Sequence, residues 1–112
     1  MRVQAKLKIG FASQVKVGLS ARRSGAQFYA FAQIARNFSI PGCVFELGDV
    51  AGGTPTLKDS LVVPIGDCPA SQFVKMTLDV VGPSMYATYN GYTPSAAAST
   101  SVTGLGAGTF TS

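Results

Sequence analysis

The sequence predicts an α+β fold: an antiparallel β-sheet of about five to six strands with an amphipathic helix packed on one of its faces. Three observations support this prediction. Apolar and polar residues alternate in the N-terminal half, glycine and proline concentrate between residues 37 and 56, and apolar residues then recur at helical spacing from Ala70 to Val81. We therefore expect strands first, then a long loop, and a helix after the last strand.

Length and composition predict one domain that associates with copies of itself. A chain of 112 residues can bury only about two thirds of its unfolded surface. The sequence is 46% hydrophobic and 12% charged, whereas globular chains are about 25% charged. We assign residues 1–81 to the sheet, a long loop at 37–55 and the first helix, and residues 82–112 to a short helical or extended segment with a Gly/Ser/Thr-rich tail. So few charges predict obligate self-association.

The N-terminal part of the chain contains three predicted strands, and the second and third of them form a hairpin. Residues 3–9 and 14–21 alternate apolar side chains with polar or small ones, which is the period of a strand with one buried face. Residues 23–25 supply turn residues, and a returning strand follows at about 27–35. The alternation puts two sets of side chains on opposite faces of this returning strand: Ala30, Ala32 and Ile34 on one, and Tyr29, Phe31 and Gln33 on the other.

The middle of the chain is rich in residues that break strands and helices. Because several glycines and prolines fall within residues 37–56, we expect a long loop there, with a short extended piece at 44–47. A further strand is predicted at 57–65, and Pro64 near its end favours an edge position.

A helix is predicted after this strand. Asp67 or Cys68 would cap it, and Pro69 suits its first turn. The apolar stripe would be formed by Ala70, Phe73, Val74, Thr77, Leu78 and Val81. Gly82 and Pro83 would end the helix. The tail from residue 93 could either stay disordered or add an edge strand through its few apolar residues.

Charge is sorted along the chain. Every charged residue before Glu46 is basic, and no charged residue follows Asp79. With a net charge of +4 and a pI near 9.3, this pattern favours a polyanion as partner. The chain has no apolar run of about 18 residues and no apolar segment ending in a cleavage site. We therefore expect a soluble, unsecreted protein without a membrane span.

The sequence lacks the residues of common active sites. It has no histidine, and its carboxylates are scattered, so general acid–base catalysis has no candidates. Phosphate loops, dinucleotide motifs and Cys/His metal clusters are absent as well. We expect a protein that is not an enzyme and has no metal, cofactor or small-molecule substrate. Cys43 and Cys68 could remain partly buried thiols, or Cys43 could cross-link neighbouring subunits after release from the cell.

Two segments resemble the coat proteins of single-stranded RNA bacteriophages, the levivirus family. Residues 15–36, VKVGLSARRSGAQFYAFAQIAR, look like the central hairpin of that family. Residues 60–82, SLVVPIGDCPASQFVKMTLDVVG, resemble its last strand running into the first of two C-terminal helices. The resemblance implies an intertwined homodimer with one continuous sheet, and an icosahedral shell in the virion that packages RNA. It also implies that the inner sheet face binds an RNA stem-loop and represses translation.

The resemblance places RNA contacts on one sheet face. The matching positions are Lys16, Ser20, Arg22, Tyr29, Phe31, Gln33, Thr56, Lys58 and Ser60. Lysine and arginine would neutralise phosphates, and aromatic rings would stack on unpaired bases. The same cations could instead form a solvated face, and the same aromatics could pack in the core.

Both ends of the chain depart from this family. Few residues precede the hairpin, and a Gly/Ser/Thr-rich tail replaces a long second helix. One hypothesis is that a tail strand around 102–110 pairs beside residues 3–9. Two rival functions are a single-stranded DNA-binding protein of filamentous-phage type, built as a small β-barrel, and a virion decoration or fibre subunit without nucleic-acid affinity. The host, the RNA hairpin and the shell geometry do not follow from the sequence.

Overall fold

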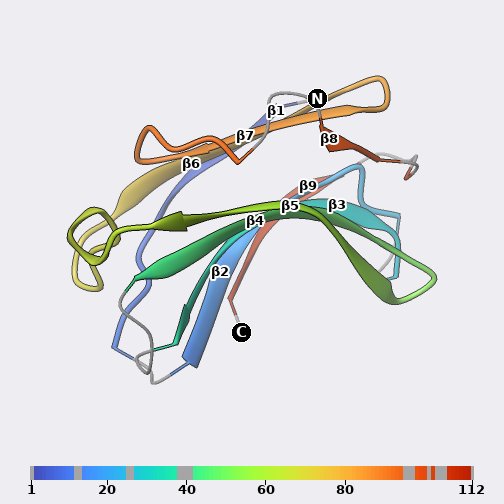
Figure 1. The fold of residues 1–112 in the computed structure, drawn as a ribbon. Coiled ribbons are helices and arrows are strands. Elements are labelled where there is room, and N and C mark those ends of the chain that lie inside the picture. The colour runs from blue at the N-terminus through green and yellow to red at the C-terminus, as the bar shows by residue number, and fades with distance from the viewer. Residues whose placement is uncertain are drawn as a thin grey trace.

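The computed structural model is an all-β sandwich of two antiparallel sheets (Figure 1). One sheet has four strands in the order β1-β6-β7-β8, and the other has five in the order β5-β4-β3-β2-β9. The strands are β1 (Arg2–Leu7), β2 (Gln14–Ala21), β3 (Tyr29–Asn37), β4 (Cys43–Ala51), β5 (Thr54–Val63), β6 (Val74–Val81), β7 (Ser84–Tyr89), β8 (Ala98–Ser99) and β9 (Ala107–Thr111). The structure describes residues 2–11, 14–24, 27–37, 42–94, 98–100, 102 and 106–111.

The predicted α+β class is wrong, because the expected helix is strand β6. It buries Met76, Leu78 and Val80 in strict alternation, which is the period of a half-buried strand. Two members of the predicted helical stripe, Phe73 and Val81, are 64% and 59% exposed. The described residues contain one 3₁₀ turn, η1 (Ile65–Asp67), and no α-helix. No helix in that part of the chain could therefore span a membrane.

The predicted long loop at 37–55 is also wrong over most of its length. Residues 43–51 form β4, an inner strand of the five-stranded sheet between β3 and β5. Gly52 and Gly53 have φ of 62° and 80° and make the tight turn into β5. The glycines that predicted a loop therefore mark a bend before β4 at Gly42, the hairpin turn at Gly52 and Gly53, and a position inside β4 at Gly48. Residues 38–41 of the predicted loop lie outside the described residues.

The predicted hairpin of the N-terminal half is confirmed. Strands β2 and β3 pair antiparallel, with Leu19 opposite Ala32. The tail forms an edge strand, which is one of the two predicted alternatives. This strand does not pair with residues 3–9 as the hypothesis expected. Strand β9 pairs with β2, whereas β1 pairs with β6.

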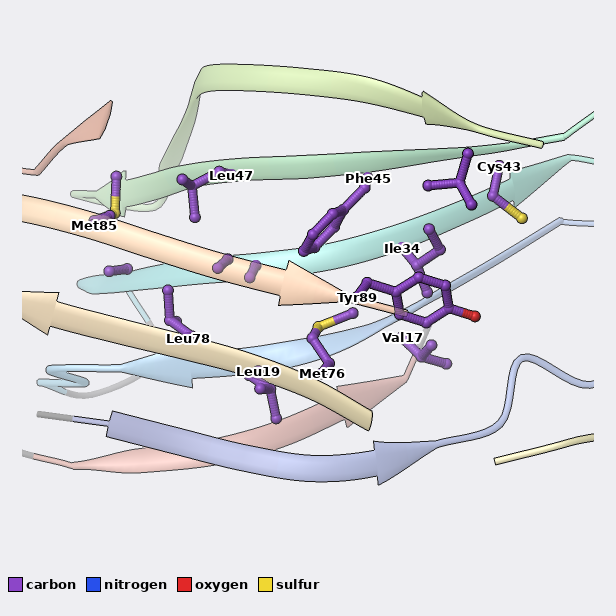
Figure 2. Packing of buried hydrophobic residues seen from close by; sticks show 14 of the residues in the cluster. Val17, Leu19, Ile34, Cys43, Phe45, Leu47, Met76, Leu78, Met85 and Tyr89 are labelled. Atoms are coloured by element: carbon purple, nitrogen blue, oxygen red, sulfur yellow. The ribbon is translucent and has the colours of Figure 1, made fainter. Parts of the chain in front are cut away.

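The core lies between the sheets, where side chains from both inner faces interdigitate (Figure 2). The Phe45 and Tyr89 rings meet across it with centroids 5.9 Å apart. The largest fully buried side chains are Tyr89, Phe45, Leu19, Ile34, Leu47, Met76, Leu78, Met85, Val17, Val63, Val80 and Cys43. The predicted helix does not cover the sheet; the chain's own second sheet covers the apolar face of the first instead.

A disulfide joins Cys43 at the start of β4 to Cys68 just after η1, with 6.4 Å between the Cα atoms. Both cysteines are fully buried. The interpretations of free thiols and of a cross-link between subunits at Cys43 are therefore corrected to a bond within the chain.

Candidate functional site

The outward face of the five-stranded sheet carries few charged side chains. In Figure 1 this sheet is curved, and its concave side points away from the four-stranded sheet. The side chains that alternate with the buried ones form what we call the five-strand face: Lys16, Gly18, Ser20, Tyr29, Phe31, Gln33, Ala35, Val44, Glu46, Gly48, Leu57, Ser60, Val62, Gly108 and Phe110. Its charged members are Lys16 and Glu46.

Two phenylalanine rings on this face lie over glycines. A Cβ atom at Gly18 would come within 2.8 Å of the Phe110 ring, and one at Gly48 within 2.8 Å of the Phe31 ring. Phe31 is consequently only 5% exposed although it points outward. The glycines let the rings pack against the sheet backbone, which gives a smooth apolar surface.

A polar pair sits among these apolar groups. Gln33 Nε2 donates a hydrogen bond of 2.9 Å to Glu46 Oε1, directly across from it in the β3–β4 ladder. Ser20 lies opposite Phe31, is 1% exposed, and its Oγ has no hydrogen-bond partner among the described residues. The Glu46 carboxylate places a negative charge where an RNA phosphate would be repelled.

The five-strand face contains most of the residues that the resemblance assigned to RNA: Lys16, Ser20, Tyr29, Phe31, Gln33 and Ser60. The other three lie elsewhere. Arg22 follows the end of β2 with a φ of 55°, Thr56 pairs with the inward-pointing Asp49, and Lys58 is the extra residue where the β4–β5 register shifts. The face therefore brings aromatic rings together with one lysine rather than with a row of cations.

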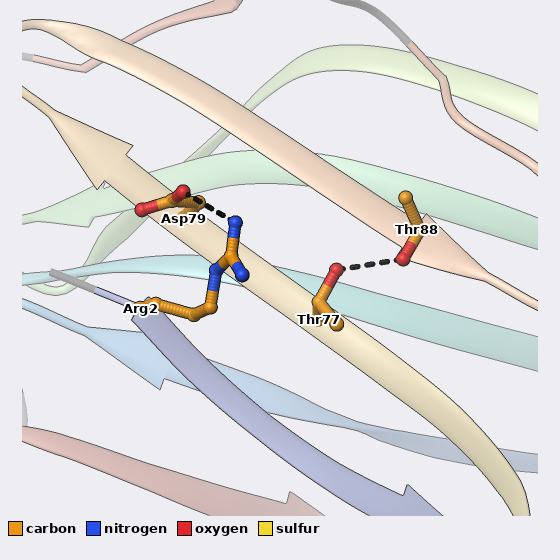
Figure 3. Close-up of polar contacts among 4 residues, drawn as sticks. All are labelled: Arg2, Thr77, Asp79 and Thr88. Carbon is orange, nitrogen blue, oxygen red and sulfur yellow. Dashed lines mark hydrogen bonds and ion pairs between the residues drawn. The ribbon is translucent and has the colours of Figure 1, made fainter.

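The outward face of the four-stranded sheet is polar. We call it the four-strand face, and its members are Arg2, Gln4, Lys6, Lys75, Thr77, Asp79, Val81, Ser84, Tyr86 and Thr88. Figure 3 shows two of its contacts: Arg2 Nη2 lies 3.2 Å from Asp79 Oδ2, and the Thr77 and Thr88 hydroxyl oxygens are 2.6 Å apart. Sequence reasoning missed this face because it treated residues 70–81 as a helix.

A groove of about 490 Å³ opens at one end of the four-strand face. It is lined by Gly66, Pro69, Gln72, Phe73, Val74, Lys75, Thr77, Thr88, Asn90 and Gly91. The Lys8 ammonium lies 5.2 Å from the centroid of the Phe73 ring at its rim. The groove thus joins the segment after η1, the start of β6 and the end of β7.

Several contacts hold the walls of the groove together. Asn90 Nδ2 donates to the Asp67 carbonyl at 2.9 Å, and Tyr92 Oη donates to Asp67 Oδ2 at 2.5 Å. This hydrogen bond, with the charge of Asp67, raises the pKa of Tyr92. The Gly10 N–H donates to the Ala70 carbonyl at 2.8 Å, and the disulfide fixes Cys68. The groove is therefore largely preformed.

The described residues do not bring catalytic groups together. They contain no group of three or more His, Cys, Asp or Glu side chains able to hold a metal. Glycoside hydrolysis requires two carboxyl groups facing each other across the substrate. On the five-strand face Glu46 has no such partner, because Asp49 points inward, is 3% exposed, and accepts a 3.0 Å hydrogen bond from Thr100.

Comparison with known proteins supports the fold alone. No family model matches the chain, and no curated protein matches it. Among solved structures it is similar to a beta-glucanase of Bacillus licheniformis, with a TM-score of 0.51 and 10% sequence identity. The match covers 98% of this chain and 49% of the glucanase, so the chain spans about half of that protein's length. The likeness supports a β-sandwich of two antiparallel sheets.

Proposed function

We propose that this chain is a non-enzymatic structural subunit that associates with copies of itself through the five-strand face. The observation that carries the proposal is the apolar character of that face. Leu57 and Val62 are 50% and 65% exposed there, beside Tyr29, Val44 and Phe110, which are only partly buried. An outward sheet face in water is usually polar, so an apolar one of this extent favours a partner that covers it.

A second copy suits this face because its charges are self-complementary. Lys16 on β2 and Glu46 on β4 lie on the same face on different strands. In a two-fold contact each copy would present its lysine to the partner's carboxylate. The low overall charge of the chain, 12%, supports self-association for the same reason.

The coat-protein function implied by the resemblance stays a prediction within this class. The disulfide suits a released particle or another oxidising setting, which is compatible with a virion. The helix on which the resemblance depended is absent from the described residues, and Glu46 stands among the proposed RNA contacts. Packaging of RNA therefore has weaker support than self-association.

Two matched variants test the proposal. Val62→Glu adds a charge to the five-strand face, and Val81→Glu adds the same charge to an equally exposed valine on the opposite sheet. We expect concentration-dependent dimers of the native chain in sedimentation velocity. Val62→Glu should weaken the association at least tenfold, and Val81→Glu should leave it unchanged. A chain that stays monomeric at millimolar concentration, or equal effects of both variants, would refute the proposal.

A further inference from the structure

We infer that the groove beside the four-strand face binds an acidic oligosaccharide, a short chain of sugar units that carry carboxylate groups. This inference is independent of self-association, because the groove belongs to the other sheet. Neither the sequence motifs nor the glucanase likeness points to it. The charge, the aromatic ring and the polar groups that line the groove favour this ligand.

The side chains that line the groove carry positive charge only. Lys75 lines the groove, and Lys6 lies directly opposite it in the β1–β6 ladder. Like charges opposite each other on neighbouring strands destabilise a sheet. Lys8 adds a third ammonium at the rim, and the described lining contains no carboxylate. The Asp67 carboxylate lies outside the lining and accepts a hydrogen bond from Tyr92. An anionic group on a ligand would relieve this repulsion.

The remaining lining groups suit a sugar ring. Phe73 lines the groove and is 64% exposed. A pyranose has an apolar face of C–H groups, which packs on an aromatic ring, and a rim of hydroxyls, which need donors and acceptors. The side chains of Gln72, Thr88 and Asn90 supply amide and hydroxyl groups around that ring.

The rigidity and size of the groove favour such a ligand over a single-stranded nucleic acid. The hydrogen bonds to Asp67 and Ala70 and the disulfide at Cys68 fix its walls before binding, which lowers the entropic cost of binding. A volume of about 490 Å³ accommodates a few sugar units. Single strands usually bind along extended basic tracks with several stacking rings, whereas Phe73 is the one aromatic residue in the described lining.

The test is a titration of the oxidised, full-length chain with a trimer of galacturonic acid, followed by NMR of its backbone amides. The methyl ester of the same trimer keeps the hydroxyls and removes the charges. We expect the acid to shift the amide signals of Lys75, Thr88 and Asn90 with millimolar affinity, and the ester to bind about tenfold more weakly. Absence of shifts at these residues at 10 mM trimer would overturn the inference, as would binding of a six-nucleotide single strand at the groove in place of the trimer.

Four variants distinguish binding in the groove from non-specific attraction between charges. Lys75→Gln should reduce affinity about tenfold, and Phe73→Ala about fivefold, whereas Phe73→Tyr should keep it. Lys16→Gln removes the same charge from the five-strand face and should leave the affinity for the trimer unchanged. Phe73 and both lysines are exposed, so the variants should fold, which thermal unfolding checks. Equal losses in Lys75→Gln and Lys16→Gln would show non-specific charge attraction and overturn the site.

Discussion

The two outward faces of this sandwich arise from the same strand alternation and have opposite chemistry. Outward positions of β2, β3 and β4 carry glycine, aromatic and aliphatic residues around the Gln33–Glu46 pair. Outward positions of β1, β6 and β7 carry lysine, threonine, glutamine and an Arg2–Asp79 ion pair. Both sets cover one shared core. The fold therefore separates a surface suited to self-contact from a surface suited to a hydrated, charged ligand.

Removing the disulfide should have the largest effect and should act unequally on the two regions. The Cys43–Cys68 bond closes a segment with a sequence separation of 25, and losing such a bond costs about 3 kcal/mol of unfolding free energy. In a Cys43→Ala, Cys68→Ala variant we expect this loss in chemical denaturation. Amide exchange should rise around Asp67 to Phe73 in the groove and change little in β2 and β3. Uniformly faster exchange would contradict the separation of the two regions.

High pH should destabilise the core that both faces share. Tyr89 is fully buried, and its hydroxyl has no hydrogen-bond partner among the described residues. Burial raises its pKa from 10.0 to about 12, partly offset by the charge of Arg36. The phenol stays neutral in the folded state. Its contribution to the free energy of unfolding is therefore fully present below pH 10, the pKa in the unfolded chain, and is lost as the pH rises through about 12, the pKa in the folded chain. Two pKa units correspond to about 2.7 kcal/mol.

The matched variant for this prediction is Tyr89→Phe. It removes a buried hydroxyl without a partner, so stability at neutral pH should be unchanged or rise by about 1 kcal/mol. Its denaturation midpoint should fall less between pH 10 and 12 than that of the native chain. Parallel pH profiles for the two proteins would show that other groups cause the alkaline loss.

Replacing glycine by alanine should destabilise the protein on the five-strand face and have little effect on stability in the groove. In Gly18→Ala the new Cβ would lie 2.2 Å from the Ala32 carbonyl oxygen and 2.8 Å from the Phe110 ring. Overpacking of this kind costs about 2 kcal/mol. In Gly66→Ala the Cβ meets nothing within 4 Å, so the change should stay within about 0.5 kcal/mol. Equal denaturation midpoints would show that the Phe110 ring does not pack over Gly18 in solution.

The five-strand face was predictable from the sequence because its determinants are local. Alternation alone separated Ala30, Ala32 and Ile34 from Tyr29, Phe31 and Gln33, and the ladder of β2 and β3 confirms this separation. That Phe31 lies over Gly48 could not be predicted, because it depends on the register of β3 against β4.

The four-strand face and the groove were missed for a different reason. Residues 74–81 satisfy both a helical spacing and a strict alternation. The helical spacing predicts a helix, although Lys75, Thr77 and Asp79 alternate with buried residues. Burial of β6 under β2 and β3 decides between the two periods, and this is a tertiary effect. The groove and the disulfide join segments distant in sequence, which spacing alone does not reveal.

The smallest expected effects concern charges on the four-strand face and test whether its lysines are placed for a ligand. The Arg2–Asp79 pair is exposed, so a double-mutant cycle with Arg2→Ala and Asp79→Ala should give an interaction energy of about 0.5 kcal/mol, which should vanish in concentrated salt.

Lys6→Gln removes one member of the Lys6–Lys75 pair and should stabilise the chain slightly, by about 0.3 kcal/mol, at low salt. If Lys6→Gln instead destabilises the chain, the lysines stabilise the sheet, and their position opposite each other no longer indicates an anionic ligand.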